Sequence, residues 1–211
     1  MKIKKIGHCC LVIEEQNARI ITDPGAWTTE QNKEQDIDAI LITHEHSDHL
    51  HIESLKAILK NNPHAKIYTG KGAGKILAVA GIKYELLEHG QSAVINGVSV
   101  TGLGRKHAVI YPAIPQVDNC GYLIGGRFFY PGDALTVPEK PVEILALPVA
   151  GPWLKISEAI DYAKNVKPKI CFPVHDGMLR ITTAFYSHPK RFLAPAGIEF
   201  KELSQGGKLL F

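Results

Sequence analysis

Three histidines and one aspartate crowd into a single short run of this chain, His44-Glu45-His46-Ser47-Asp48-His49. Imidazole and carboxylate groups are the ligands that suit zinc, iron, manganese or nickel. His44 and His46 are two residues apart, so in an extended or turn-like backbone their side chains point the same way, toward one ion. Asp48 and His49 are consecutive and diverge, which favours a second ion nearby. The run therefore predicts half of a two-metal centre.

Three further candidate ligands lie downstream, and each follows an apolar stretch typical of a strand: His107, Asp133 and His175. Loops at strand ends are where α/β folds collect functional groups. Two catalytic metal sites need about seven protein contacts, which is the number that these residues and the first run supply together. An isolated histidine in such a place is more often an ordinary loop residue, and Asp133 after Gly132 could be a turn residue. The ordered set favours the ligand interpretation.

Short strands are expected to position the first run. Alternating or continuous apolar residues predict strands at 2–6, 10–14, 18–22 and 39–43, the last of which leads directly into the run. Beyond it, apolar residues at helical spacing predict a helix that begins near Ile52 and stops at Asn61-Asn62-Pro63. Ser47 or Asp48 is expected to cap that helix.

Strands and helices alternate through the rest of the chain. Strands are expected at 66–68, 83–87, 92–95, 98–103, 120–124, 127–130, 144–148 and 169–174, with helices at 72–80, 157–165 and 182–192. Asn96-Gly97 and Gly125-Gly126 are typical of hairpin turns. Hairpins mixed with helical crossovers predict mixed sheets covered by helices, an α/β sandwich. No linker or composition break divides the 211 residues, so we expect one domain over 1–211.

Composition narrows the cellular setting and the partners. Hydrophobic residues make up 45% of the chain and charged residues 21%, which is ordinary for a globular protein, and the net charge of +3 is too small to indicate nucleic-acid binding. The apolar piece at 9–13 is too short for a signal peptide or a membrane span. The four cysteines form no CxxC pair and indicate reduced thiols in the cytoplasm, although Cys9 and Cys10 follow His8 and leave a metal or redox role open. The sequence also leaves a homo-oligomer open.

The pattern Thr-His-x-His-x-Asp-His, a later histidine, Gly-Asp after an aromatic-rich strand and a final histidine after a buried strand resembles the metallo-β-lactamase-fold metallohydrolases. The resemblance covers essentially the whole chain and implies a four-layer αββα sandwich of two mixed β-sheets covered by helices. Gly7-His8, the turn Thr22-Asp23-Pro24 and the compact length resemble the small branch related to L-ascorbate-6-phosphate lactonase.

The resemblance implies two divalent metal ions, and their ligands can be carried over residue by residue. It places His44, His46 and His107 on one ion, Asp48, His49 and His175 on the other, and Asp133 between them as a bridge. It also implies that Asp48 orients a reacting water or accepts its proton. Zinc is the favoured ion, and manganese, iron or nickel also fit these nitrogen and oxygen donors.

The implied activity is hydrolysis by a hydroxide that bridges the two metals. Two divalent ions, two carboxylates and a hydroxide leave a formal charge of about +1, which favours a small anionic substrate. We expect an ester, lactone or phosphoester as the bond that is cleaved. The alternatives are a metal-binding regulatory or sensor protein without turnover, and an iron-based redox protein on the same ligands.

Four other residues are candidates for supporting roles. Asp23 would fix the tautomer of a metal-bound imidazole, or it is a simple turn residue. His8 would line the pocket or bond to a buried neighbour. Trp153 would wall the pocket or pack under its loop, and Lys155 would meet an anion.

Overall fold

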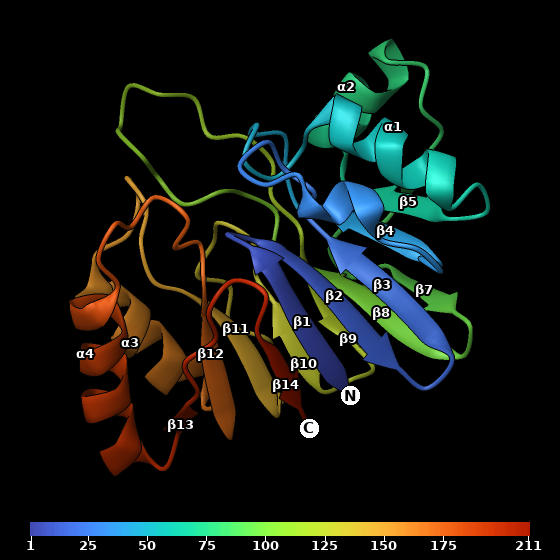
Figure 1. Cartoon of the computed structure of the whole chain (residues 1–211). Coiled ribbons are helices and arrows are strands. Elements are labelled where there is room, and N and C mark those ends of the chain that lie inside the picture. The colour runs from blue at the N-terminus through green and yellow to red at the C-terminus, as the bar shows by residue number, and fades with distance from the viewer.

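Two β-sheets of seven strands each pack face to face, with helices on both outer surfaces (Figure 1). The computed structural model describes every residue from Met1 to Phe211. Helices α1 (Ile52–Asn61) and α2 (Lys71–Val79) cover one sheet, and α3 (Ile156–Val166) and α4 (Thr183–Leu193) cover the other. The predicted αββα sandwich is confirmed.

The first sheet is built from the N-terminal part of the chain and one C-terminal strand. Its order is β14 (Lys208–Leu210), β1 (Lys2–Gly7), β2 (Cys10–Glu15), β3 (Ala18–Thr22), β4 (Ala39–Ile42), β5 (Lys66–Thr69) and β6 (Glu85–Leu86). Strands β14 to β3 pair antiparallel, and β3 to β6 pair parallel. Parallel neighbours need crossover connections, which are supplied by the 3-10 helix at Glu30–Lys33, α1 and α2.

The second sheet holds the remaining strands. Its order is β13 (Glu199–Phe200), β12 (Ile170–Val174), β11 (Ile144–Pro148), β10 (Phe128–Tyr130), β9 (Gly121–Ile124), β8 (Val98–Leu103) and β7 (Ser92–Ile95). The hairpin between β7 and β8 turns at Asn96-Gly97, as predicted, and the hairpin between β9 and β10 turns at Gly125-Gly126. A short 3-10 helix at Ala194–Ala196 follows α4.

Side chains alternate between two separate apolar layers along each central strand. In β2, Leu11 and Ile13 enter the core between the sheets, whereas Val12 packs beneath α1 and α2. In β11, Ala146 faces the other sheet and Leu147 faces α3 and α4. Strands buried on both faces need continuous apolar sequence, which explains why these segments show no polar alternation.

The structure corrects the expected start of α1. The helix begins at Ile52 as predicted, but its N-cap is His51, whose ring lies 3.0 Å from the Ser54 hydroxyl and caps no backbone amide of the helix. The prediction of Ser47 or Asp48 as the cap is wrong. The chain turns tightly just before the helix, where the amides of His49 and Leu50 both bond to the carbonyl of His46.

The C-terminal strand β14 was not predicted. It adds to the outer edge of β1, with Leu210 opposite Lys2, and so returns the chain end to the first sheet. The helices are short, the longest having 11 residues, and none is long and apolar enough to cross a membrane.

Candidate metal centre

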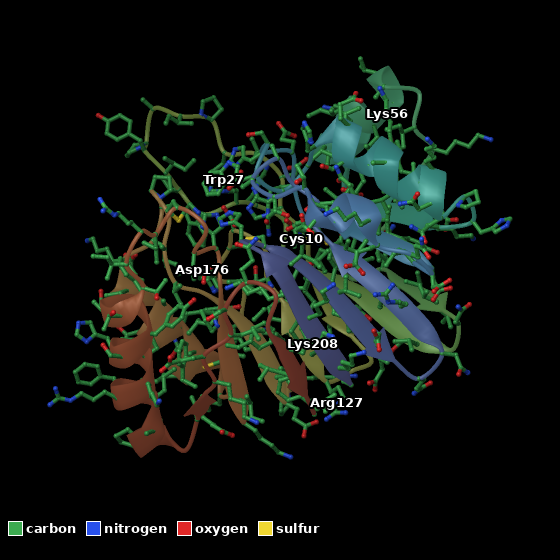
Figure 2. The ribbon with its side chains drawn as sticks, viewed as in Figure 1. Cys10, Trp27, Lys56, Arg127, Asp176 and Lys208 are labelled. Atoms are coloured by element: carbon green, nitrogen blue, oxygen red, sulfur yellow. The ribbon has the colours of Figure 1, made fainter.

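Loops from both sheets meet at one end of the sandwich. The run from His44 to His49 follows β4, whereas His107, Asp133 and His175 follow β8, β10 and β12 of the other sheet. In Figure 2 this end of the sandwich lies near the labels of Asp176, which follows β12, and Trp27, which belongs to the loop between β3 and β4. All seven residues predicted as ligands lie together here, and their role as ligands stays a prediction.

One group consists of three histidines and Asp133, whose donor atoms all lie within 4.8 Å of one another. His44 Nε2 is 3.1 Å from His46 Nδ1, and His107 Nε2 is 3.2 Å from Asp133 Oδ2. Atoms bound to one zinc at about 2.0–2.1 Å lie roughly 3.4 Å apart in a tetrahedral arrangement. The observed spacing therefore suits a cation between these side chains.

A second group lies on the other side of the Asp133 carboxylate. Asp48 Oδ2 is 3.6 Å from both His49 Nε2 and His175 Nε2. Asp133 reaches the same two rings, with Oδ1 3.1 Å from His49 Nε2 and Oδ2 2.8 Å from His175 Nε2. Asp133 thus faces both groups, as a bridging ligand must.

Four buried atoms of this centre make no hydrogen bond in the protein, although some lie close to one another: His49 Nε2, Asp133 Oδ1, and His175 Nδ1 and Nε2. Buried polar atoms are almost always paired, because leaving one without a partner costs about 1–3 kcal/mol. Unpaired imidazole nitrogens beside an unpaired carboxylate oxygen are donors that a divalent cation would satisfy. The residues present therefore fit a metal centre.

Asp23 is a buried residue that holds side chains of the centre in place by hydrogen bonds. Its Oδ2 is 2.7 Å from His49 Nδ1 and accepts hydrogen bonds from the hydroxyls of Thr43 at 2.7 Å and Tyr130 at 2.6 Å. Its Oδ1 accepts from the Thr43 amide at 2.8 Å. The bond to Asp23 occupies Nδ1 of His49 and leaves Nε2 facing the centre. This is the contact that was predicted as one of two roles for Asp23.

Two other rings are also held through Nδ1. His107 Nδ1 lies 2.6 Å from the carbonyl of Ala108, which can only accept, so Nδ1 carries the proton. The Thr43 hydroxyl donates to Asp23 and so accepts from His44 Nδ1, at 2.9 Å. In each ring Nε2 faces Asp133 Oδ2, at 3.9 Å for His44 and 3.2 Å for His107.

Neighbouring groups in the centre shift the pKa values of its carboxyl and imidazole side chains. Burial alone raises the pKa of the Asp48 carboxyl, but the hydrogen bond with His8 and the imidazoles of His49 and His175 lower it to about 2. Burial is likewise outweighed at Asp133, where His49 and His175 hold the pKa well below its usual range. Burial lowers the pKa of His44 well below that of a free imidazole. Two ionised carboxylates beside a neutral imidazole are suited to divalent cations.

Trp153 contacts the centre directly, through a hydrogen bond that the sequence did not indicate. Its Nε1 donates a hydrogen bond to Asp133 Oδ2 at 2.9 Å, and the side chain is almost entirely buried. Both roles suggested for Trp153 are thus combined, because the ring packs under its loop and also borders the site. Lys155 is exposed at the start of α3, where its amide donates to Glu158.

His8 and Cys9 also lie at the centre. The sulfur of Cys9 and ring nitrogens of His8, His49 and His175 all lie within 4.8 Å of one another. His8 Nε2 is 3.1 Å from Asp48 Oδ2. His8 and Cys9 form the turn that follows β1. His175 lies more than 160 positions later in the chain, so no local sequence pattern indicates that these residues are close.

The fold and the ordered ligand set define a class of protein. Residues 2–175 match the family model of the beta-lactamase superfamily domain, and the chain belongs to the metallo-β-lactamase superfamily.

Individual relatives narrow the comparison. The chain is 36% identical over 184 residues to Protein Rv0786c of Mycobacterium tuberculosis, covering 85% of each chain. It is 27% identical over 212 residues to a UPF0173 metal-dependent hydrolase of Thermoplasma acidophilum, covering 93% of this chain and 91% of that one. A crystal structure of a metal-dependent hydrolase from Parabacteroides distasonis superposes with a TM-score of 0.78 at 26% identity, covering 95% and 91%. The finer resemblance to L-ascorbate-6-phosphate lactonase stays a prediction.

Proposed function

We propose that this protein is a hydrolase that depends on two divalent cations and cleaves an ester, lactone or phosphoester of a small anionic substrate. The observation that carries the proposal is the meeting of five imidazoles and two carboxylates from both sheets, with the unpaired Nε2 atoms of His49 and His175 beside the carboxylate of Asp133. Relatives named as metal-dependent hydrolases support the reaction class.

The residues divide into two sets around Asp133. His44, His46 and His107 would hold one cation, and Asp48, His49 and His175 the other. Zinc is the favoured ion, with manganese, iron and nickel as alternatives. Bound there, divalent cations would lower the pKa of a shared water toward neutrality and polarise the carbonyl or phosphoryl oxygen of the substrate.

Asp48 and Asp133 then have different tasks. The Asp48 side chain is 16% exposed and that of Asp133 is 3% exposed, so Asp48 borders the side from which substrate and water enter. From that position Asp48 would accept a hydrogen bond from the reacting water and orient it. Asp133 accepts a hydrogen bond from Trp153 and would bind both cations, which fixes the position of one ligand set relative to the other.

The expected setting follows from the thiols and the charge of the centre. All four cysteines are free and buried, which supports a reducing compartment, and we propose the cytoplasm. Two divalent cations would exceed the charge of the two carboxylates, which favours a small anionic substrate, and the net charge of +3 gives no indication of nucleic-acid binding.

Metal removal tests the proposal. Protein stripped with a chelator should lose hydrolysis of an anionic lactone, ester or phosphodiester in a substrate panel. Re-addition of about two equivalents of zinc, manganese, iron or nickel should restore it, because the cations activate the nucleophile. Metal content by elemental analysis and initial rates are the measurements.

Other results would support a different function. Tight binding of two ions without hydrolysis of any panel member would favour the sensor. Oxygen-dependent turnover confined to the iron form would favour the redox protein. Hydrolysis that persists in the stripped protein would overturn the metal-dependent mechanism.

A further inference from the structure

The His8 ring is held on both of its nitrogens. Nδ1 accepts a hydrogen bond from the Gly177 amide at 3.1 Å, and Nε2 lies 3.1 Å from Asp48 Oδ2. The ring centroid lies 4.3 Å from those of both Trp27 and His175, and His8 is only 4% exposed. Such a packed ring has a fixed orientation.

The contact with Gly177 decides where the proton of His8 lies. A backbone amide can only donate, so Nδ1 must accept and Nε2 carries the hydrogen. If the ring gained a second proton, Nε2 would keep its own. A nitrogen that carries a proton cannot bind a cation, so His8 is not a metal ligand, although it lies beside Cys9, His49 and His175.

The Gly177 amide is itself held in place by a buried ion pair. Lys5 Nζ lies 2.6 Å from Asp176 Oδ2, and the Tyr186 hydroxyl donates to the same oxygen. A Cβ added at Gly177 would lie 3.0 Å from His8 Cβ and 3.1 Å from Nδ1, so glycine allows this close approach. His8 adopts a φ of +48°, an uncommon conformation for a residue with a side chain. The geometry is therefore built from two distant parts of the chain.

We infer that His8 is a positioning residue: its Nε2–H donates to Asp48 Oδ2 and aims that carboxylate at the cation shared with His49 and His175. The inference rests on the metal centre of the proposed function and goes beyond it by assigning a task to a residue outside the ligand set. Hydrogen-bond partners of metal ligands commonly control metal affinity, and their loss costs about 10–100-fold.

Two substitutions separate the two contacts of the ring. In His8→Asn the amide oxygen lies near the position of Nδ1 and can accept from Gly177, but the side chain is too short to reach Asp48. Asparagine also tolerates a positive φ. In His8→Gln the longer side chain carries an N–H near the position of Nε2. We expect His8→Asn to weaken one of two cation sites by about 10–100-fold, and His8→Gln to restore most of that affinity.

Titration of the metal-free protein with zinc, followed by calorimetry and chelator competition, measures this without any substrate. The thermal unfolding midpoint of the metal-free variants is the control for a merely structural role. We expect His8→Asn, which keeps the contact with Gly177 and tolerates the positive φ, to be at least as stable as His8→Gln, so that its weaker metal binding does not come from instability. In an Asp48→Asn background, His8→Asn should cause no further loss of affinity. Should His8→Asn not fold, His8→Gln alone carries the test, since retained binding at both sites supports donation from Nε2.

Two outcomes would overturn the inference. Unchanged affinity at both sites in His8→Asn would show that the contact with Asp48 does not matter, and an equal loss in Asn and Gln would show that the imidazole is itself required. A wild-type protein that binds no divalent cation would instead defeat the proposed function, before the variants are compared.

Discussion

Asp133→Ala should abolish the binding of both cations and lower kcat/KM for hydrolysis by at least about 10³-fold, since activation by bound metals is worth several kcal/mol and about 1.4 kcal/mol is tenfold in rate. The size of the effect follows from geometry. The two oxygens of Asp133 lie 2.8–3.2 Å from ring nitrogens of His49, His107 and His175, which belong to both ligand sets. A change at any single histidine would touch only one set.

Elemental analysis after dialysis and initial rates on the best substrate of the panel measure the two parts of this expectation. Asp118→Ala is the matched control, because Asp118 is a carboxylate on the surface that pairs with Lys106 at 2.7 Å. It should keep both ions and full activity. An Asp133→Ala protein that retained two tightly bound ions would contradict the bridging role, and one that retained a single ion with full activity would point to a mononuclear enzyme.

Asp23→Ala should lower the free energy of unfolding of the metal-free protein by about 3–5 kcal/mol, the loss expected when one partner leaves a buried charged network. Asp23 is fully buried and serves four groups: the ring of His49, the hydroxyl of Tyr130, and the amide and hydroxyl of Thr43. With the carboxylate gone, these buried groups lose their partner, and an unpaired buried donor is costly.

Urea denaturation with a chelator present isolates this effect from metal binding. Asp161→Ala on the exposed face of α3 removes a carboxylate without buried partners and should change stability by less than about 0.5 kcal/mol. A loss below about 1 kcal/mol at Asp23 would mean that water replaces the carboxylate, contrary to a dry network. The variant should also bind cations more weakly by about 10–100-fold, because the tautomer of His49 is no longer fixed.

The sequence predicted most of what local patterns can encode. Strands with apolar residues on both faces, such as β4 and β12, stand out because their neighbours in the chain are polar, and His44 and His175 lie where those strands end. Asp23 could be anticipated only in part, because a carboxylate in an Asp-Pro turn is equally well explained as a simple turn residue.

The rest depends on contacts between distant segments. Strand β14 has three residues and is defined by its pairing with β1, so periodicity could not find it. The cap of α1 was missed because the preceding turn is shaped by the centre rather than by the helix. The bond from Trp153 to Asp133 joins the loops that follow two neighbouring strands of one sheet, β11 and β10. The contact of His8 with Gly177 spans 169 positions and forms only when the two sheets dock.

The meeting of both sheets at the candidate ligands also bears on how the protein matures. Each sheet has its own hydrogen-bonded ladder, and the seven candidate ligands divide between them as four residues from the loop after β4 and three from the other sheet. In the proposed two-metal centre, a chain with only one sheet formed would offer too few donors for two ions, so tight metal uptake would await docking of the two layers. Metal content would then report the fraction of molecules in which the two sheets have docked. Each bound ion would also be held by side chains from both sheets and would oppose the sliding of one sheet over the other.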